Sequence, residues 1–489
     1  MSQSLREAAA RPIEFGTDGW RGVIAADFTI ERVARVAPLA AKALEAEFGP
    51  STGSRTVLIG YDRRFMAEDF ARVAAEAVQA AGYTVKLSDC YAPTPVFSWI
   101  AHHEQALGAI VLTASHNPGR YLGLKVKGAF GGSVAPDVTK KIETMLAQGT
   151  FPEPVANPEP IGSFNPWDSG YCEALRQFVD IGAIREAITQ GKLTVFVDAM
   201  HGASAGGLSQ VLDVPIHELN TNRDPLFEGG APEPLPKYTT RSIAQIRDHQ
   251  QANPEQLVVG LVFDGDCDRI AAIDGSGEFL TSQILIPILI QHLAVERGQT
   301  GEVVKTVSGS DLMPKVAALY DLPVYETAVG YKYIADRMLS VPVLIGGEES
   351  GGVGYGSHIP ERDALLSALY VLEAVVKSSK SLGALYGALQ DKTAFFNAYD
   401  RIDLALASMA ARDRVLSQLQ TNPPSEIAGQ GVVSCQTTDG YKFRLADGDW
   451  LMIRFSGTEP VLRLYCEGVT LDRVHQILAW AKTWAEAAS

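Results

Sequence analysis

The sequence lacks several features that would place a chain in a specialised class of protein. It has only five cysteines among 489 residues and no C-x-x-C pair, so it predicts neither a zinc site nor a disulfide framework. Its longest apolar stretch, near 284–290, contains Pro287 and is too short to span a bilayer. The segment 1–12 has no apolar core of the kind that marks a signal peptide. These absences predict a cytoplasmic protein with no membrane partner.

Positive charge is also scarce. The chain has 42 Lys and Arg against 57 Asp and Glu, which gives a formal net charge of −15. Proteins bind nucleic acids and anionic membranes through clustered Lys and Arg, so we expect neither as a partner. A small anionic ligand is compatible with this balance if its site gathers positive charge locally. The sequence leaves a monomer and a small homo-oligomer both open.

The length exceeds that of one hydrophobic core, so several domains are expected. Three apolar runs, at 109–113, 257–263 and 341–345, each lead into an unusual polar loop. Such runs are typical of strands buried on both faces of α/β domains, where ligands bind at the carboxyl ends of strands. The last part of the chain instead alternates strand-like segments with a closing helix at 471–488, an α+β pattern.

The first loop places Ser115 directly after a buried strand. Pro118 disfavours a helical conformation at Asn117, so the chain should turn and present Ser115 at the sheet edge. Taken alone, a Ser-His-Asn-Pro sequence such as 115–118 is most often a surface turn. A hydrolase nucleophile is disfavoured because no G-x-S-x-G motif is present, and because the backbone should point the adjacent His116 away from Ser115.

The second loop carries Asp264, Asp266 and Asp268, with Cys267 as a spacer. Three carboxylates at alternating positions supply enough oxygen for a divalent cation. An EF-hand is excluded because glycine and glutamate are missing at the required positions. A solvated acidic turn is a weak alternative, since the three charges would repel one another unless a cation compensates.

The third loop sets Glu348, Glu349 and Ser350 among glycines, which let the backbone approach a ligand closely. Glutamate and serine suit sugar hydroxyls, although a flexible hairpin tip would have the same composition. Further along, His358 is interpreted as a loop-orienting residue. Asp363 is interpreted as the N-cap of a helix that begins at residue 364.

Two more segments are rich in glycine and arginine. The segment 454–460, together with Arg463, combines hydroxyls, a glycine turn and guanidinium groups, as a phosphate cradle requires. The segment 15–22 is a glycine-rich turn that carries Arg21, and alone it is a weak signal.

Taken in order, the segments 15–22, 113–118, 264–269, 347–351 and 454–460 resemble the α-D-phosphohexomutase superfamily, which contains phosphoglucomutases and phosphomannomutases. The resemblance covers essentially the whole chain. It implies three related α/β domains plus a C-terminal α+β domain around a central cleft. The expected domains are 1–160 with the phosphoserine loop, 161–276 with the metal loop, 277–392 with the sugar loop and 393–489 with the phosphate loop.

The resemblance also implies a role for each matched residue. Ser115 resembles the phosphorylated serine, and with Asp264, Asp266 and Asp268 it would hold Mg²⁺. Lys125 and Arg269 match catalytic positions, with Lys125 as general acid/base, although Lys127 lies on the same strand face. The implied substrate-binding residues are Arg21, Arg64, Lys332, Glu348, Ser350, Arg454, Ser456, Gly457, Thr458 and Arg463.

The implied activity interconverts hexose 1-phosphate and hexose 6-phosphate through phospho-Ser115 and a hexose 1,6-bisphosphate, which is also the expected activator. Glucose is the first substrate to consider and mannose the second. A glucose-1,6-bisphosphate synthase would use the same residues, and a non-catalytic sugar-phosphate sensor is the alternative from another class. A haloacid-dehalogenase-type phosphatase would leave Ser115 and the C-terminal cradle unexplained. One departure is Leu122, where many members have asparagine.

Overall fold

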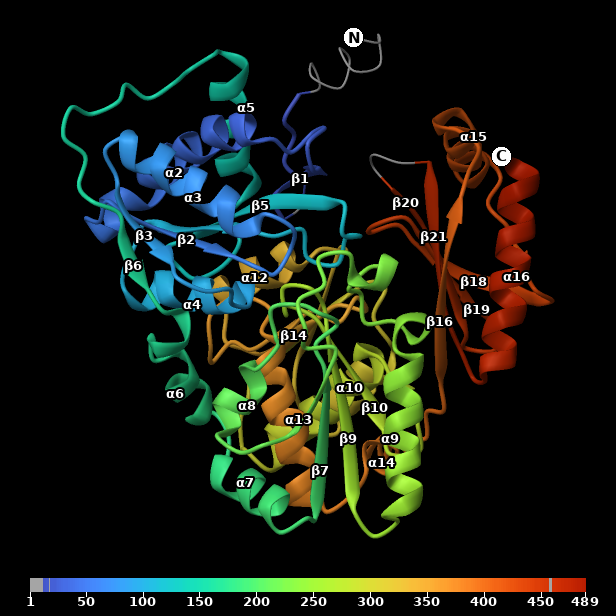
Figure 1. Cartoon of the computed structure of the whole chain (residues 1–489). Coiled ribbons are helices and arrows are strands. Elements are labelled where there is room, and N and C mark those ends of the chain that lie inside the picture. Colours follow the sequence, from blue (N-terminus) through green and yellow to red (C-terminus); the bar gives the residue numbers. More distant parts are fainter. Residues whose placement is uncertain (1–11, 17, 457–459) are drawn as a thin grey trace.

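The computed structural model describes residues 12–16, 18–456 and 460–489. The chain forms four units in sequence order, each built on its own sheet, and Figure 1 shows the fourth unit beside the other three. Three units mix helices with partly parallel sheets, and the fourth packs helices on an antiparallel sheet, so the predicted fold class is confirmed. Within the described residues, we find no helix with the length and apolarity needed to cross a membrane.

The first unit has a six-stranded sheet in the order β1-β5-β4-β2-β3-β6. Its strands are β1 (Trp20–Val23), β2 (Thr56–Tyr61), β3 (Thr84–Ser88), β4 (Gly108–Leu112), β5 (Tyr121–Gly128) and β6 (Gly162–Phe164). Its helices are α2 (Ile30–Thr52), α3 (Ala67–Ala80), α4 (Thr94–His103) and α5 (Pro136–Ala147). Strand β6 follows the proline-rich segment 151–160 and pairs with β3. The domain boundaries themselves stay predictions.

The two faces of the first sheet bury different cores. Along β4, Ile110 and Leu112 pack into a core with α2, α3 and α5. Ala109 and Val111 point to the opposite face, because successive side chains of a strand alternate. That second face is covered by α4, and its core continues without a break into the second and third units. The first three units therefore form one packed body.

The second unit has a five-stranded sheet in the order β11-β10-β9-β7-β8. Its strands are β7 (Leu193–Asp198), β8 (His217–Leu219), β9 (Leu257–Phe263), β10 (Ile270–Asp274) and β11 (Phe279–Leu280). Its helices are α6 (Tyr171–Arg176), α7 (Ile181–Thr189), α8 (Gly207–Leu212) and α9 (Thr240–Ala252). Short 3₁₀ turns are η1 (Pro166–Asp168), η2 (Phe227–Gly229) and η3 (Pro236–Tyr238).

The third unit has a four-stranded sheet in the order β13-β12-β14-β15. Its strands are β12 (Glu302–Thr306), β13 (Val324–Thr327), β14 (Val343–Gly347) and β15 (Val353–Gly354). Its helices are α10 (Ser282–Val295), α11 (Leu312–Ala318), α12 (Tyr331–Ser340), α13 (Ala364–Ser378) and α14 (Leu382–Thr393). The carboxylate of Asp363 accepts a hydrogen bond from the Leu366 amide, which confirms the predicted N-cap of α13.

The fourth unit has an antiparallel six-stranded sheet in the order β16-β21-β20-β19-β18-β17. Its strands are β16 (Ala398–Ala405), β17 (Glu426–Ile427), β18 (Gln430–Gln436), β19 (Tyr441–Leu445), β20 (Trp450–Phe455) and β21 (Val461–Gly468), and its helices are α15 (Met409–Thr421) and α16 (Leu471–Ala488). Both helices pack on one face over a separate core. On the other face, Trp450, Met452 and Tyr465 contact Val307, so the fourth unit docks on the third.

Candidate active site

A cleft of about 730 Å³ opens where the four units meet. The polar loops that follow β4, β9 and β14 contribute to its wall. Of the residues predicted from the sequence, its lining includes Arg21, Arg269, Lys332, Glu348, Ser350, Arg454 and Arg463. The structure adds seven charged residues for which no site role was predicted from the sequence: Glu14, Asp18, Glu233, Glu349, Arg362, Arg401 and Asp403.

Ser115 lies in a strained turn at the end of β4. Its φ is +51°, a left-handed conformation that residues other than glycine rarely adopt and that often marks functional sites. Its Oγ donates a hydrogen bond of 2.8 Å to Asp264. The guanidinium of Arg64 lies beneath this turn and donates to the carbonyls of Ser115 (2.5 Å) and Asn117 (2.7 Å). Arg64 is fully buried and is not among the lining residues, so it holds the loop.

The expectation that His116 points away from Ser115 is wrong. His116 Nδ1 lies 3.4 Å from Ser115 Oγ, and the ring lines the cleft. The left-handed backbone at Ser115 departs from the extended geometry in which neighbouring side chains diverge. Burial, followed by the charges of Arg269 and Arg21, lowers the pKa of His116 well below its usual value. The imidazole is therefore neutral.

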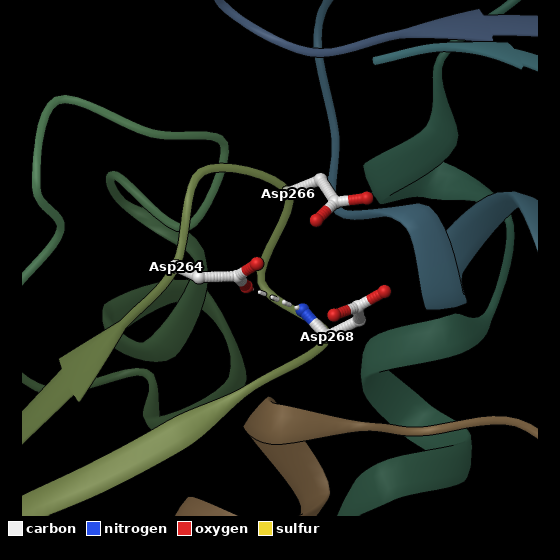
Figure 2. Close-up of side chains that lie close together, drawn as sticks. All are labelled: Asp264, Asp266 and Asp268. Carbon is white, nitrogen blue, oxygen red and sulfur yellow. Dashed lines mark hydrogen bonds between the residues drawn. The ribbon is translucent and has the colours of Figure 1, made fainter. Parts of the chain in front are cut away.

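Asp264, Asp266 and Asp268 converge in the loop after β9 (Figure 2), and each offers an oxygen within 4.8 Å of the others. Asp264 accepts hydrogen bonds from the amides of Asp268 (3.0 Å) and Arg269 (3.1 Å), which curl the loop. One oxygen each of Asp266 and Asp268 is buried and has no hydrogen-bond partner in the parts of the chain that the structure describes. Buried, unpartnered carboxylate oxygens are the ligands of hard divalent cations, so the three residues fit such an ion.

Side-chain cations offset the repulsion among these carboxylates. Lys125 Nζ lies 2.7 Å from Asp18, 2.8 Å from Asp266 and 2.9 Å from Asp268. Burial alone would lower the pKa of Lys125, but the three carboxylates outweigh it and raise the pKa. Lys127, the alternative on the same strand face, instead binds Glu361 at 2.5 Å and Asp18 at 3.2 Å. Lys125 therefore contacts the aspartate loop directly, whereas the ion pairs of Lys127 are with Asp18 and Glu361.

Arg362 joins three units at this point. Its guanidinium lies 2.6 Å from Asp18 of the first unit and 2.7 Å from Asp268 of the second. Gly352 makes room for it, because a Cβ there would lie 2.5 Å from Arg362 Cδ. The sequence offered weak signals for this network. Asp18 lies inside the glycine-rich segment 15–22, and Arg362 immediately precedes the helix cap.

The third-unit loop supplies a buried carboxylate to the cleft. Burial and the neighbouring Glu349 raise the pKa of Glu348 to about 7, although Arg362 and Arg269 oppose the shift. Ser350 lines the cleft beside it. Lys332, on α12, also faces the cleft, and its Nζ lies 4.8 Å from the centre of the Tyr333 ring.

The fourth unit brings arginines to the opposite side of the cleft. Arg454 and Arg463 face each other across the β20–β21 pair. The Ser456 amide donates to the Val461 carbonyl at 3.0 Å, which closes the base of the turn between these strands. Gly457 and Thr458 lie outside the described residues. Arg401, on β16, lies 3.8 Å from Glu233 and 3.9 Å from Glu349, so it links the fourth unit to the second and third.

Comparisons with known proteins agree with this arrangement. Family profiles described as phosphoglucomutase/phosphomannomutase alpha/beta/alpha domains I, II and III and C-terminal domain match residues 12–153, 169–277, 281–393 and 406–480. The crystal structure of a protein described as a phosphomannomutase from Thermus thermophilus is 31% identical, with a TM-score of 0.83 and coverage of 97% of this chain and 99% of that chain.

Two curated relatives match over a similar length. The phosphoglucomutase/phosphomannomutase of Thermococcus kodakarensis is 27% identical over 95% of this chain and 96% of its own. The phosphoglucosamine mutase of Halorhodospira halophila is 28% identical and covers 97% of each chain. The chain belongs to the α-D-phosphohexomutase superfamily, a family of isomerases of carbohydrate metabolism. The five loop segments and their order along the sequence predicted this family.

Proposed function

We propose that this protein moves a phosphoryl group between the 1- and 6-oxygens of a hexose through phospho-Ser115. The observation that carries the proposal is the placement of Ser115 Oγ in a strained turn, 2.8 Å from Asp264 and 3.4 Å from His116 Nδ1. His116 lines the cleft to which the fourth unit contributes Arg454 and Arg463. One end of a sugar phosphate can then react while the other end is held.

The proposed reaction has two transfers of the same kind. In the first, the bond between phosphorus and Ser115 Oγ breaks and a bond to the free sugar oxygen forms, which gives a hexose 1,6-bisphosphate. The sugar turns end over end, and its other phosphate returns to Ser115. Mg²⁺ held by Asp264, Asp266, Asp268 and the phosphoserine would supply positive charge that polarises the phosphoryl group.

The remaining roles follow from the contacts of each side chain. Lys125, whose raised pKa keeps its Nζ protonated among the carboxylates next to Ser115, is the proposed general acid/base. It would give its proton to the leaving Ser115 Oγ and take the proton of the sugar hydroxyl in exchange. Arg21 and Arg269 line the cleft on the Ser115 side and would donate to the reacting phosphate. For Arg64, which is bound to loop carbonyls, we propose that it positions Ser115 rather than binds substrate.

The side chains that face the sugar are proposed to be Glu348, Ser350 and Lys332, with Arg454, Ser456, Gly457, Thr458 and Arg463 at the non-reacting phosphate. We propose glucose as the preferred hexose. The relatives include phosphoglucosamine mutases, but a 2-amino cation would need a free carboxylate. Glu233, Glu349 and Asp403 are already next to Arg401, and the pKa of Glu348 is about 7, which favours neutral hydroxyls. Glu14 also lines the cleft, so a preference for glucosamine would point to its carboxylate.

A substrate panel tests this proposal. The 1-phosphates of glucose, mannose and glucosamine would be compared with Mg²⁺ and the matching 1,6-bisphosphate as activator, and we expect the highest kcat/KM with glucose 1-phosphate. A clear preference for glucosamine 1-phosphate would overturn the sugar assignment alone. Accumulation of bisphosphate in place of 6-phosphate would identify a bisphosphate synthase, and binding without turnover would identify a sensor.

A further inference from the structure

The turn between β18 and β19 contacts Arg454, which lines the cleft from the fourth unit. Asp439 in this turn accepts a 2.9 Å hydrogen bond from Arg454 Nε through its Oδ2 atom. The same oxygen accepts a 2.9 Å hydrogen bond from the Val329 amide of the third unit. Gly440 fixes the turn against β20, since its φ is +98° and a Cβ there would lie 2.5 Å from the Ile453 carbonyl oxygen. Asp439 is thereby held next to Arg454.

We propose that Asp439 is a positioning residue for substrate binding, which fixes the guanidinium of Arg454 toward the non-reacting phosphate and ties it to the loop 328–330. This inference rests on the proposed function, in which Arg454 binds that phosphate. Asp439 itself is not among the residues that line the cleft, so it acts through Arg454.

The geometry at Arg454 supports this role. Asp439 holds the Nε side of the guanidinium, and no acceptor among the described residues takes a hydrogen bond from either Nη atom. Arginine can bind phosphate with two parallel N–H groups, and a guanidinium whose plane is already fixed loses less freedom on binding. Arg463 lies opposite Arg454 on the neighbouring strand, so the carboxylate also reduces repulsion between the two cations.

The second hydrogen bond of Asp439 reaches the sugar side of the cleft. Val329 belongs to the short loop before α12, the helix that carries Lys332. The next residue, Gly330, places its amide beside Glu348. The amide favours the charged carboxylate and so partly opposes the rise that burial causes in the pKa of Glu348. One side chain of the fourth unit is thus connected to both the proposed phosphate ligand and the proposed sugar ligands.

A double-mutant cycle tests the inference. Asp439→Ala should raise KM for the hexose phosphate about 10-fold and change kcat less than about 2-fold. The reason is the loss of the charge-assisted hydrogen bond that orients the Arg454 guanidinium. Asp439→Asn keeps an acceptor oxygen and should recover part of the loss. In an Arg454→Ala background, Asp439→Ala should have no further effect, since it acts through Arg454. Asp447→Asn, which weakens another ion pair of the fourth unit, is the matched control.

The outcomes separate the inference from the proposed function. If Asp439→Ala kept the wild-type KM while Arg454→Ala had a lower kcat/KM, the role of Asp439 would be overturned and the phosphate site at Arg454 would stand. Additive losses in the double variant would also overturn it, because they would show that Asp439 acts independently of Arg454. If Arg454→Ala itself kept the wild-type kcat/KM, the proposed phosphate site of the fourth unit would be wrong and the inference with it.

Discussion

The two sides of the cleft handle charge in opposite ways. On the Ser115 side, Lys125 and the three aspartates are almost completely buried, and Lys125 contacts three carboxylates. On the fourth-unit side, the Arg454 side chain is 20% exposed and contacts one carboxylate, and Arg463 Nε has no hydrogen-bond partner among the described residues. The lysine on the Ser115 side is thus enclosed by carboxylates, whereas Arg454 and Arg463 on the fourth-unit side keep N–H groups for a ligand.

This difference fits two tasks. Phosphoryl transfer depends on fixed groups in a site with little water, where electrostatic interactions are strong. Holding whichever phosphate is not reacting instead needs donors that can bind and release a ligand repeatedly. Substitutions should therefore abolish chemistry on the Ser115 side and weaken binding on the Arg454 side.

The largest effect is expected at Ser115. Ser115→Ala removes the phosphoryl carrier and should lower kcat on the order of 10⁴-fold or more, with Tm nearly unchanged. Intact-mass analysis should find phosphate on part of the wild-type protein and peptide mapping should place it on Ser115. Ser98 is also buried, and its hydroxyl has no hydrogen-bond partner within the described part of the chain, so Ser98→Ala should keep full activity. Phosphate at a different residue in fully active protein would contradict the assignment.

The next effect concerns the metal loop. Asp264→Asn keeps an oxygen that can accept from the Asp268 and Arg269 amides, so the loop should stay folded, but it removes one charge from the cation site. We expect the Mg²⁺ affinity, measured by calorimetric titration of metal-free protein, to fall by at least about 10-fold, since the loss of a residue that only supports a ligand already costs that much. Mg²⁺ should also raise the Tm of wild type more than that of the variant. Equal affinities would show that the cation binds elsewhere.

A smaller effect is expected across the cleft. Arg454→Ala should lower kcat/KM about 10- to 150-fold, the cost of one charged hydrogen-bond donor, and leave Ser115 phosphorylation detectable. More 1,6-bisphosphate should escape during turnover, because the turning intermediate loses an anchor. Arg473→Ala is the control, since Arg473 binds Asp447 and Asp449 instead of lining the cleft. Unchanged kcat/KM without leakage would remove the fourth unit from the mechanism.

The smallest effect concerns stability at Glu348. Its folded pKa of about 7 lies above the usual 4.5, so the charged form is disfavoured in the fold, with Glu349, Arg362 and Arg269 facing it. Stability should therefore be lost as pH rises from about 5 through 7. Glu348→Gln removes this penalty, by at most about 3 kcal/mol, and its Tm advantage over wild type should grow between pH 5 and pH 8. An advantage independent of pH would refute the ionisation argument.

Local patterns predicted much of this molecule. The segments predicted at 257–263 and 471–488 coincide with β9 and α16, because each is bounded by turn residues and has a clear apolar pattern. The run at 341–345 was placed two residues early, since Pro342 precedes the paired part of β14. The aspartate loop was predicted as a cation site because its three ligands are close in sequence.

The long-range charge network could not be predicted in this way. Asp18, Lys125, Asp268 and Arg362 come from three different units, and nothing in their local sequence states that they meet. Arg401 is equally isolated in β16. The direction of the His116 side chain could not be predicted, because it depends on the left-handed backbone at Ser115. Glycine is the usual sequence signal for that conformation, and it is absent at this position.

The distribution of hydrophobic cores has a thermodynamic consequence. A core shared by the first three units couples their unfolding, so these units should melt as one cooperative block. The fourth unit has its own core and follows the third through the short segment between Thr393 and Ala398, so it can open at lower free-energy cost. Amide exchange should therefore be slower at β4 and β9 than at the contacts between the third and fourth units. The unit that can open at the lowest free-energy cost is therefore the one proposed to hold the non-reacting phosphate.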